Sequence, residues 1–289
     1  MSQNSESRVG DGSNYFPIGP FPFDGLPVEI ALVILKMAMT KSGTYAVLMR
    51  TSRSLAGLVR LKCVPEMVVL NNRPCAMSFY QCVTSHPGVG AGVKQLWFLP
   101  GITRQQAQTI GAAIINACGN LERLMRLPDV LVNMCSRAFF QHTALVDVTL
   151  MDPIIPWDRL LGAPHGAALF RQITALRLIG GTHPVAPPHG TSFPRLTDLT
   201  VVGESTSCVQ TYLVDRARFP ALIGVVVTVP YLNWRNIGMN FLMSERELQD
   251  DRLCVLHCPK KWKELDVWCE GVQRIWDMGV NERNTRNGL

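Results

Sequence analysis

A short apolar pattern recurs along most of the chain, and this repeat most constrains its fold. The pattern is apolar-x-x-apolar-x-apolar. Seven segments match it: Val64/Met67/Val69, Val93/Leu96/Phe98, Leu121/Leu124/Arg126, Leu145/Val148/Leu150, Ile173/Leu176/Leu178, Leu196/Leu199/Val201 and Leu222/Val225/Val227. Asp251/Cys254/Leu256 is a poorer eighth copy, and successive middle positions are 23 to 29 residues apart. The alternation at the end of each segment is typical of a half-buried strand.

The stretches between these segments have the spacing of helices. Residues 103–118 are the clearest example, because Ala107, Ile110 and Ile114 recur at helical intervals and Gly119 follows the end. A strand–helix unit of this length cannot bury its apolar face alone, so neighbouring units must stack. The fold class predicted is α/β, with a curved parallel sheet in a leucine-rich-repeat-like solenoid that has irregular turns. A doubly wound α/β domain is the alternative, and it predicts less regular spacing.

Composition narrows the function classes. Of the 289 residues, 47% are hydrophobic and 17% are charged, as in a well-buried globular protein. The net charge of +6 comes from dispersed residues, except for Lys260, Lys261 and Lys263, so we expect no nucleic-acid partner. No run is long and apolar enough for a membrane helix, and no membrane partner is expected. The nine cysteines form no Cys-x-x-Cys pair, which favours free thiols in the cytoplasm or nucleus.

Motifs for catalysis or for cofactor binding are weak. The Gly-rich stretch 88–94 leads into a strand rather than a helix, so we interpret it as a flexible loop and not a phosphate site. Cys254 and Cys258 could form half of a zinc site, but no second pair completes it. The histidines stand in no recognisable catalytic motif. We therefore expect no cofactor, no metal and no enzymatic activity; an enzyme with a scattered active site is the weaker alternative.

The N-terminal segment 26–39 reads as a short helix that is apolar on almost every face. Pro27 suits the helix start and Glu29 suits the first turn, and Lys36 is the next charge. The segment is too short to span a bilayer, which takes about 20 apolar residues. Such a helix needs burial on more than one side. Two more short helices are predicted at residues 44–50 and 52–62, and the three together make a marginal core.

This N-terminal region resembles an F-box. The resemblance rests on Leu26-Pro27-x-Glu29-Ile30-x-x-x-Ile34-Leu35, on Tyr45-x-x-Leu48-x-Arg50 and on Leu58, while the aromatic residue that usually follows the later motif is missing. The whole layout is similar to fungal F-box-like proteins. The resemblance implies a substrate adaptor of a cullin-RING (SCF-type) ubiquitin ligase, whose F-box docks onto a Skp-type adaptor while its repeats capture a target protein.

Carried onto this sequence, the docking residues implied are Leu26, Pro27, Ile30, Ile34, Leu35, Leu48 and Leu58. The alternative is that they only pack the module against the first repeat. A target would bind the concave sheet surface, which the outward-facing strand residues line. The candidates there are Trp97, Arg123, Arg177 and Asp198; ordinary exposed strand positions are the alternative.

The predicted organisation has four parts. They are a disordered tail (1–21), an F-box-like module (22–62), the leucine-rich-repeat-like region (63–258) and a C-terminal cap and tail (259–289). In the last part, Trp268, Val272, Ile275 and Trp276 share a helical face that could cover the exposed edge of the core. The alternative function is a repeat scaffold for protein–protein interaction that has lost ligase binding.

Overall fold

The chain divides into two compact units, Met1–Cys63 and Val64–Leu289, close to the predicted boundary after residue 62. The computed structural model describes residues 25–38, 47–48, 57, 59, 63–99, 104–136, 142–152, 155–180, 186–202, 206–229, 250–257, 263–270, 275 and 277–278. The predicted tail 1–21 lies outside these residues. In the first unit the principal element is helix α1, Val28–Ala38. It begins directly after Pro27, whose carbonyl accepts the first helical bond from the Ala31 N–H at 3.0 Å.

The second unit is built on one open sheet of eight parallel strands. Its strands are β1 (Met67–Leu70), β2 (Gln95–Phe98), β3 (Arg123–Arg126), β4 (Asp147–Met151), β5 (Ala175–Ile179), β6 (Asp198–Val202), β7 (Gly224–Val229) and β8 (Leu253–His257). Their spatial order is the sequence order, β1 to β8, with every pair parallel. The predicted α/β class and the parallel sheet are therefore confirmed.

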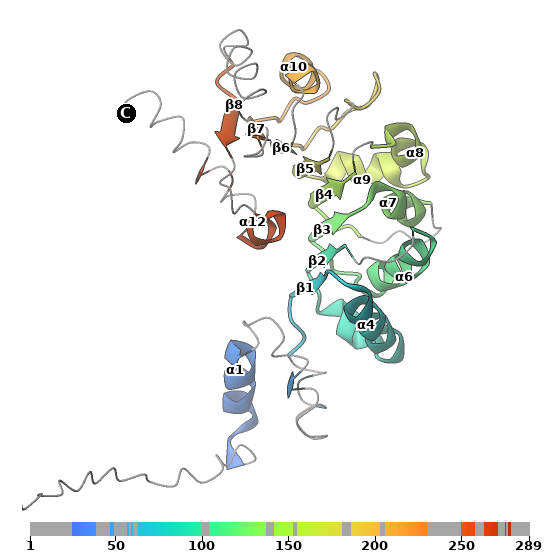
Figure 1. The fold of residues 1–289 in the computed structure, drawn as a ribbon, viewed down its shortest axis with the longest axis vertical. Helices are drawn as coiled ribbons and strands as arrows, with labels where there is room; N and C mark the ends of the chain where they lie inside the picture. Colours follow the sequence, from blue (N-terminus) through green and yellow to red (C-terminus); the bar gives the residue numbers. More distant parts are fainter. Residues whose placement is uncertain are drawn as a thin grey trace, which may run out of the picture. The chain divides into compact units, whose positions relative to one another are not determined.

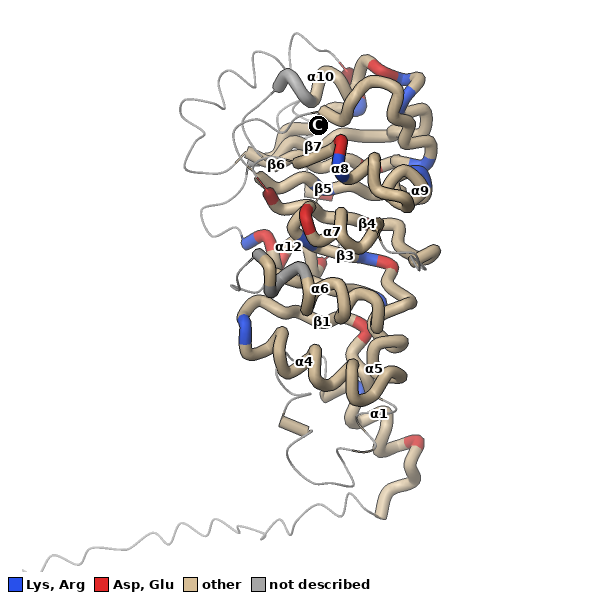
Figure 2. The backbone as a smooth tube through the Cα atoms, turned by 90° about the vertical axis from the view of Figure 1, so that its right-hand side faces the viewer, with Lys and Arg blue, Asp and Glu red and all other residues tan. Residues whose placement is uncertain are grey.

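The described helices that come between strands in the sequence form a layer on one face of the sheet (Figure 1, Figure 2). They are α4 (Arg73–Ser85), α5 (Pro87–Ala91), α6 (Arg104–Ala117), α7 (Pro128–Cys135), α8 (Trp157–Gly162), α9 (Gly166–Gln172) and α10 (Thr206–Val214). A further helix, α12 (Glu264–Glu270), lies on the opposite face of the sheet. Parallel sheets are normally covered on both faces, because crossover helices and other elements must bury both sets of side chains.

The apolar pattern of the sequence becomes one row of side chains beneath the helices. The register aligns Leu96, Leu124, Val148, Leu176, Leu199, Val225 and Leu253 across β2 to β8. All are almost fully buried in a single continuous core with α4 to α10. A strand residue that faces this core is followed by one that faces away from it, so each apolar alternation corresponds to one strand.

Backbone hydrogen bonds repeat from strand to strand. The carbonyl of Glu66, just before β1, accepts from the N–H groups of Lys94 and Gln95, both at 2.8 Å. The same double acceptance occurs at Lys94, Glu122, Val146, Thr174 and Thr197. Strands β2 to β7 therefore enter the sheet in the same way, although the connections between them differ in length.

The predicted pattern was wrong by one residue at both ends of the sheet. Val68 and Leu70 face the core, whereas Met67 is exposed; at the other end Leu253, and not Cys254, aligns with Val225. A slip of one residue in a strand transfers every side chain to the other face. Burial at both edges therefore decides the register, which the weak apolar pattern there left ambiguous.

Arg126 occupies a core position on the helix face, where the repeat otherwise has an apolar residue. It is fully buried, and its Nη1 donates to the Phe98 carbonyl at 2.9 Å while its guanidinium lies 3.4 Å from the centre of the Phe98 ring. Burial lowers the pKa of Arg126 well below its ordinary value. Gly111 of α6 leaves room for the guanidinium, because a Cβ there would lie 1.9 Å from Arg126 Nη2.

The Gly-rich stretch 88–94, predicted as a flexible loop, contains helix α5 instead. Pro87 begins this helix at a position where its missing N–H costs nothing. Gly90 serves close packing rather than flexibility. A Cβ on Gly90 would lie only 2.2 Å from the Ala117 carbonyl oxygen of α6, whereas a Cβ on Gly88 would have no atom within 4 Å.

These two glycines provide a matched test within one helix. We expect Gly90→Ala to lower the free energy of unfolding by about 1–3 kcal/mol, because the backbone of α6 must move to admit the methyl group. Gly88→Ala should leave it unchanged or raise it by up to about 1 kcal/mol through better helix propensity. Chemical denaturation of both variants measures the difference. Equal effects would contradict the close approach of α5 and α6.

Candidate functional site

Two rows of side chains line the sheet face opposite the helix layer, and we call this surface the α12 face. The first row runs through Gln95, Arg123, Asp147, Ala175, Asp198 and Gly224. The second runs through Val69, Trp97, Met125, Thr149, Arg177, Thr200, Val226 and Cys254. All four predicted target-binding residues lie in these rows. The second row is apolar at its ends and polar in the middle.

Helix α12 covers part of this face, so the predicted residues are less accessible than expected. Trp97 and Arg177 are each only 3% exposed, and Arg123 and Asp198 are half-buried. The expectation of an open recruiting surface needs correction at Trp97 and Arg177. The reason is tertiary: a helix from the far end of the sequence lies over the strands that carry these two residues.

Trp268 of α12 packs directly on the sheet. Its ring meets that of Trp97 edge to face, with 5.4 Å between centroids, and both pack with Met125. The predicted C-terminal cap is therefore misplaced for this residue, since Trp268 lies on β2 and β3 and not at the open edge of the core. Its indole N–H is buried, and no described residue accepts a hydrogen bond from it. Such an unmet donor typically costs about 1–3 kcal/mol.

Arg123 holds the backbone and the ring of Trp268 at once. Its Nη2 donates to the Trp268 carbonyl at 2.7 Å, and its guanidinium lies 4.7 Å from the centre of the indole ring. Nε donates to Asp147 Oδ2 at 2.8 Å and Nη1 donates to Gln95 Oε1 at 3.1 Å. Burial raises the pKa of Asp147, and the charge of Arg123 opposes part of that rise.

Arg177 provides the second polar contact with α12. Its guanidinium forms an ion pair with Glu264, one helical turn before Trp268. The side chain of Arg177 is 4% exposed and that of Glu264 is 21% exposed, so little water screens the pair. Asp198 has no such role. It accepts a hydrogen bond from the neighbouring Thr197 Oγ1 at 2.7 Å.

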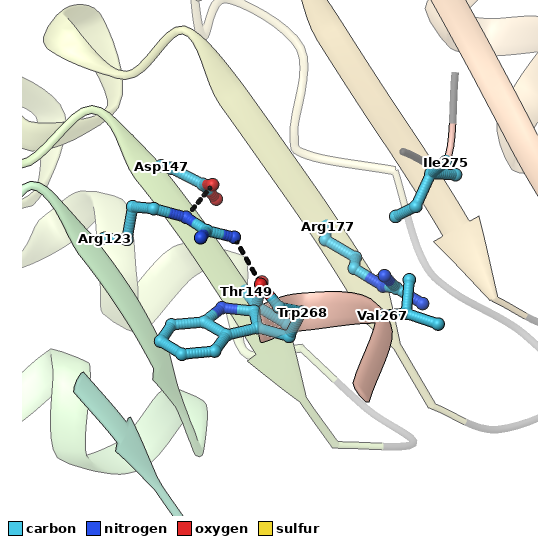
Figure 3. Close-up of a pocket in the computed structure, with 7 residues that line it drawn as sticks. All are labelled: Arg123, Asp147, Thr149, Arg177, Val267, Trp268 and Ile275. Atoms are coloured by element: carbon cyan, nitrogen blue, oxygen red, sulfur yellow. Dashed lines mark hydrogen bonds and ion pairs between the residues drawn. The ribbon is translucent and has the colours of Figure 1, made fainter. Parts of the chain in front are cut away.

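The C-terminal segment contacts both halves of the sheet. Trp268 packs on β2 and β3, while Val267 and Ile275 pack with Val226 of β7 and with two residues of β8, Cys254 and Leu256. Between these apolar contacts lies a cavity of about 10 Å³, lined by Arg123, Asp147, Thr149, Arg177, Val267, Trp268 and Ile275 (Figure 3). That volume admits about one water molecule, so the arrangement suits a helix–sheet interface and not a substrate pocket.

The predicted docking residues of the N-terminal unit are only partly accessible. Pro27, Ile30 and Ile34 are exposed, and Leu26 and Leu48 are half-buried. Leu35 is 2% exposed, so its assignment to a docking surface needs correction. It shares the inner side of α1 with Ala31, one turn earlier. Leu58 lies outside the described residues.

The sequence reasoning missed three exposed residues of α1. Val28, Val33 and Met37 are 51%, 54% and 69% exposed and add to the apolar surface around Ile30 and Ile34. The sequence did indicate further exposed apolar residues, since the helix is apolar on almost every face. Only the burial of Ala31 and Leu35 shows which side is inward. On the α12 face, Glu264 was likewise outside the predicted set.

Other kinds of site find no support within the described ranges. No three His, Cys, Asp or Glu side chains there gather as a metal site would require. None of the described helices has the length and apolar character needed to cross a membrane. Cys63, Cys118 and Cys135 are buried free thiols, and burial raises the pKa of Cys118 and Cys135 to about 12. They are therefore poor nucleophiles.

Comparison with known proteins gives no relative: no family model, no curated protein and no solved structure matches the chain.

Proposed function

We propose that this protein recruits a target protein to a cullin-RING ubiquitin ligase. In this proposal α1 docks onto a Skp-type adaptor, and the sheet of the second unit binds the target. The observation that carries the proposal is the exposed apolar surface of α1. Five large apolar side chains of one eleven-residue helix, Val28, Ile30, Val33, Ile34 and Met37, remain exposed. A contiguous exposed apolar surface is typical of a protein-binding site, whereas single exposed apolar residues are common on any protein.

The finer fold assignment is part of the same proposal. The first unit is an F-box-like module of three short helices, and the second is a leucine-rich-repeat-like solenoid. Sequential strand order supports the solenoid, because each strand pairs with the next along the chain. The helices α4 to α10, which come between strands in the sequence, form one layer. The backbone carbonyl of the residue before each of β1 to β6 accepts two hydrogen bonds from the next segment, and this recurrence supports the solenoid as well. The protein itself performs no chemistry: it brings a target close to the ligase.

Charged residues in the exposed surface of α1 should abolish adaptor binding. Ile30→Asp with Ile34→Asp places two carboxylates one turn apart in the proposed apolar contact. Both positions are exposed, so the substitutions should leave the fold intact. We expect the affinity of the full chain for a purified Skp-type adaptor to fall at least about thirtyfold, which corresponds to a loss of about 2 kcal/mol. Isothermal titration calorimetry measures it.

The control is Val214→Asp, which adds one carboxylate at an exposed apolar position of α10. It should bind the adaptor as the unmodified chain does. If the unmodified chain shows no binding at micromolar concentrations, the ligase proposal fails. The scaffold alternative then becomes the better account.

A further inference from the structure

We propose that the α12 face around Trp97, Arg123 and Arg177 is a binding site for an amphipathic helix that carries a carboxylate one turn before a tryptophan. Helix α12 is the chain's own occupant of this site, and a partner helix of the same chemistry binds in its place. The inference rests on the proposed function, because it names the kind of target segment that the sheet would recruit.

Three contacts define what the site recognises. Trp97 receives the edge of the Trp268 ring, and Arg123 both stacks on that ring and binds the backbone carbonyl of the same residue. Arg177 pairs with Glu264. Residues four apart lie on the same side of a helix. One helix face therefore contacts all three sheet residues. The separation of Trp97 and Arg177 on the sheet sets the spacing that a bound helix needs between its tryptophan and its carboxylate.

Charge makes the site selective. Asp147 already pairs with Arg123, whereas the positive charge of Arg177 meets a carboxylate that α12 supplies. A helix with Lys or Arg in place of Glu264 would bring two cations together where the Arg177 side chain is only 4% exposed. Such a like-charge contact strongly disfavours the wrong partner.

Several features make α12 an exchangeable occupant rather than a permanent part of the core. Its described part has seven residues, and a helical segment of that length is not stable without tertiary contacts. Its contacts include two largely buried ion pairs or charge-assisted bonds, which contribute more to specificity than to net stability. A cavity and the unmet indole N–H of Trp268 remain at its centre. A free helix must compete with an occupant on the same chain, whose effective concentration is high.

The test is peptide exchange on the full chain. A fluorescein-labelled peptide of residues 260–279 is titrated with the unmodified chain and with the Trp268→Ala chain, and anisotropy reports binding. We expect the peptide to bind Trp268→Ala at least tenfold more tightly, because the weakened α12 vacates the site. A peptide carrying Trp268→Ala should not bind either chain. Equal affinity for the unmodified and Trp268→Ala chains would overturn the inference.

A charge exchange gives the sharper criterion. The Arg177→Glu chain should reject the native peptide and bind a peptide with Glu264→Arg, whereas the unmodified chain should reject that altered peptide. If circular dichroism shows that the Trp268→Ala chain does not fold, the full chain with Glu264→Arg takes its place in the titration. This substitution should release α12 without removing an apolar side chain. Failure of the altered peptide to bind Arg177→Glu would also overturn the inference. No adaptor is present, so this result is independent of adaptor binding by α1.

Discussion

Replacing Phe193 by alanine should lower the free energy of unfolding by about 3–5 kcal/mol, the range for a large buried aromatic side chain. Phe193 is fully buried at the centre of an aromatic cluster in the helix-face core. Its ring lies 5.6 Å from that of Phe170, 6.1 Å from that of Trp157 and 5.2 Å from the stacked ring of Phe219. These residues come from three successive connections of the sheet, β4–β5, β5–β6 and β6–β7, so the lost side chain weakens contacts between neighbouring connections as well as within one.

Guanidinium denaturation monitored by circular dichroism measures this loss. Phe193→Leu is the graded comparison, since it retains most of the apolar volume and should cost clearly less than the alanine variant. Val214→Ala, at a position that is 70% exposed, should change the free energy of unfolding by less than about 0.5 kcal/mol. A small effect of Phe193→Ala, similar to that of Val214→Ala, would contradict the burial of this cluster.

Acid should destabilise the protein through His142. Burial lowers the pKa of His142 to about 4 from an ordinary value near 6.5, because the charged imidazolium is poorly solvated there. Below pH 6.5 the unfolded chain gains a proton that the folded chain resists until about pH 4. The contribution of neutral His142 to the free energy of unfolding is therefore fully present above pH 6.5. It is lost as the pH falls from 6.5 to about 4. The shift corresponds to about 3 kcal/mol at pH 4.

The measurement is the pH dependence of the unfolding free energy between pH 7.5 and pH 4. His142→Leu removes the titrating group, so its stability should decline about 3 kcal/mol less over this range than that of the unmodified chain. Val214→Ala, at an exposed position that carries no titrating group, should follow the unmodified curve. If the His142→Leu and unmodified curves fall in parallel, the imidazole is not buried in the neutral form.

Much of the sheet could be predicted because its signal is local. Alternation over a few residues places Leu96, Val148 or Leu199 in the core without reference to the rest of the chain. The prediction failed at β1 and β8, where the apolar pattern is less distinct and only burial decides between Met67 and Val68. It failed also at α5, since Gly90 is read as flexible until the close approach of Ala117 is known.

The candidate sites were less predictable, for a related reason. The rows that contain Trp97, Arg123 and Arg177 follow from strand alternation, but the element that covers them does not. Arg123 and Trp268 are 145 residues apart in sequence, and their contact depends on how the whole sheet presents its second face. In α1 an apolar helix was evident, whereas the inward position of Leu35 and the exposure of Met37 depended on packing.

By itself, the sequence determined the α/β class, the succession of strands and the residues that form the core, because periodic burial is a property of neighbouring residues. Only the tertiary structure decided that α12 lies on the second face of the sheet, with Glu264 on Arg177 and Trp268 between Trp97 and Arg123. The physical reason is that such a contact requires complementary shape and charge from distant segments, and no local pattern records which distant segments will meet.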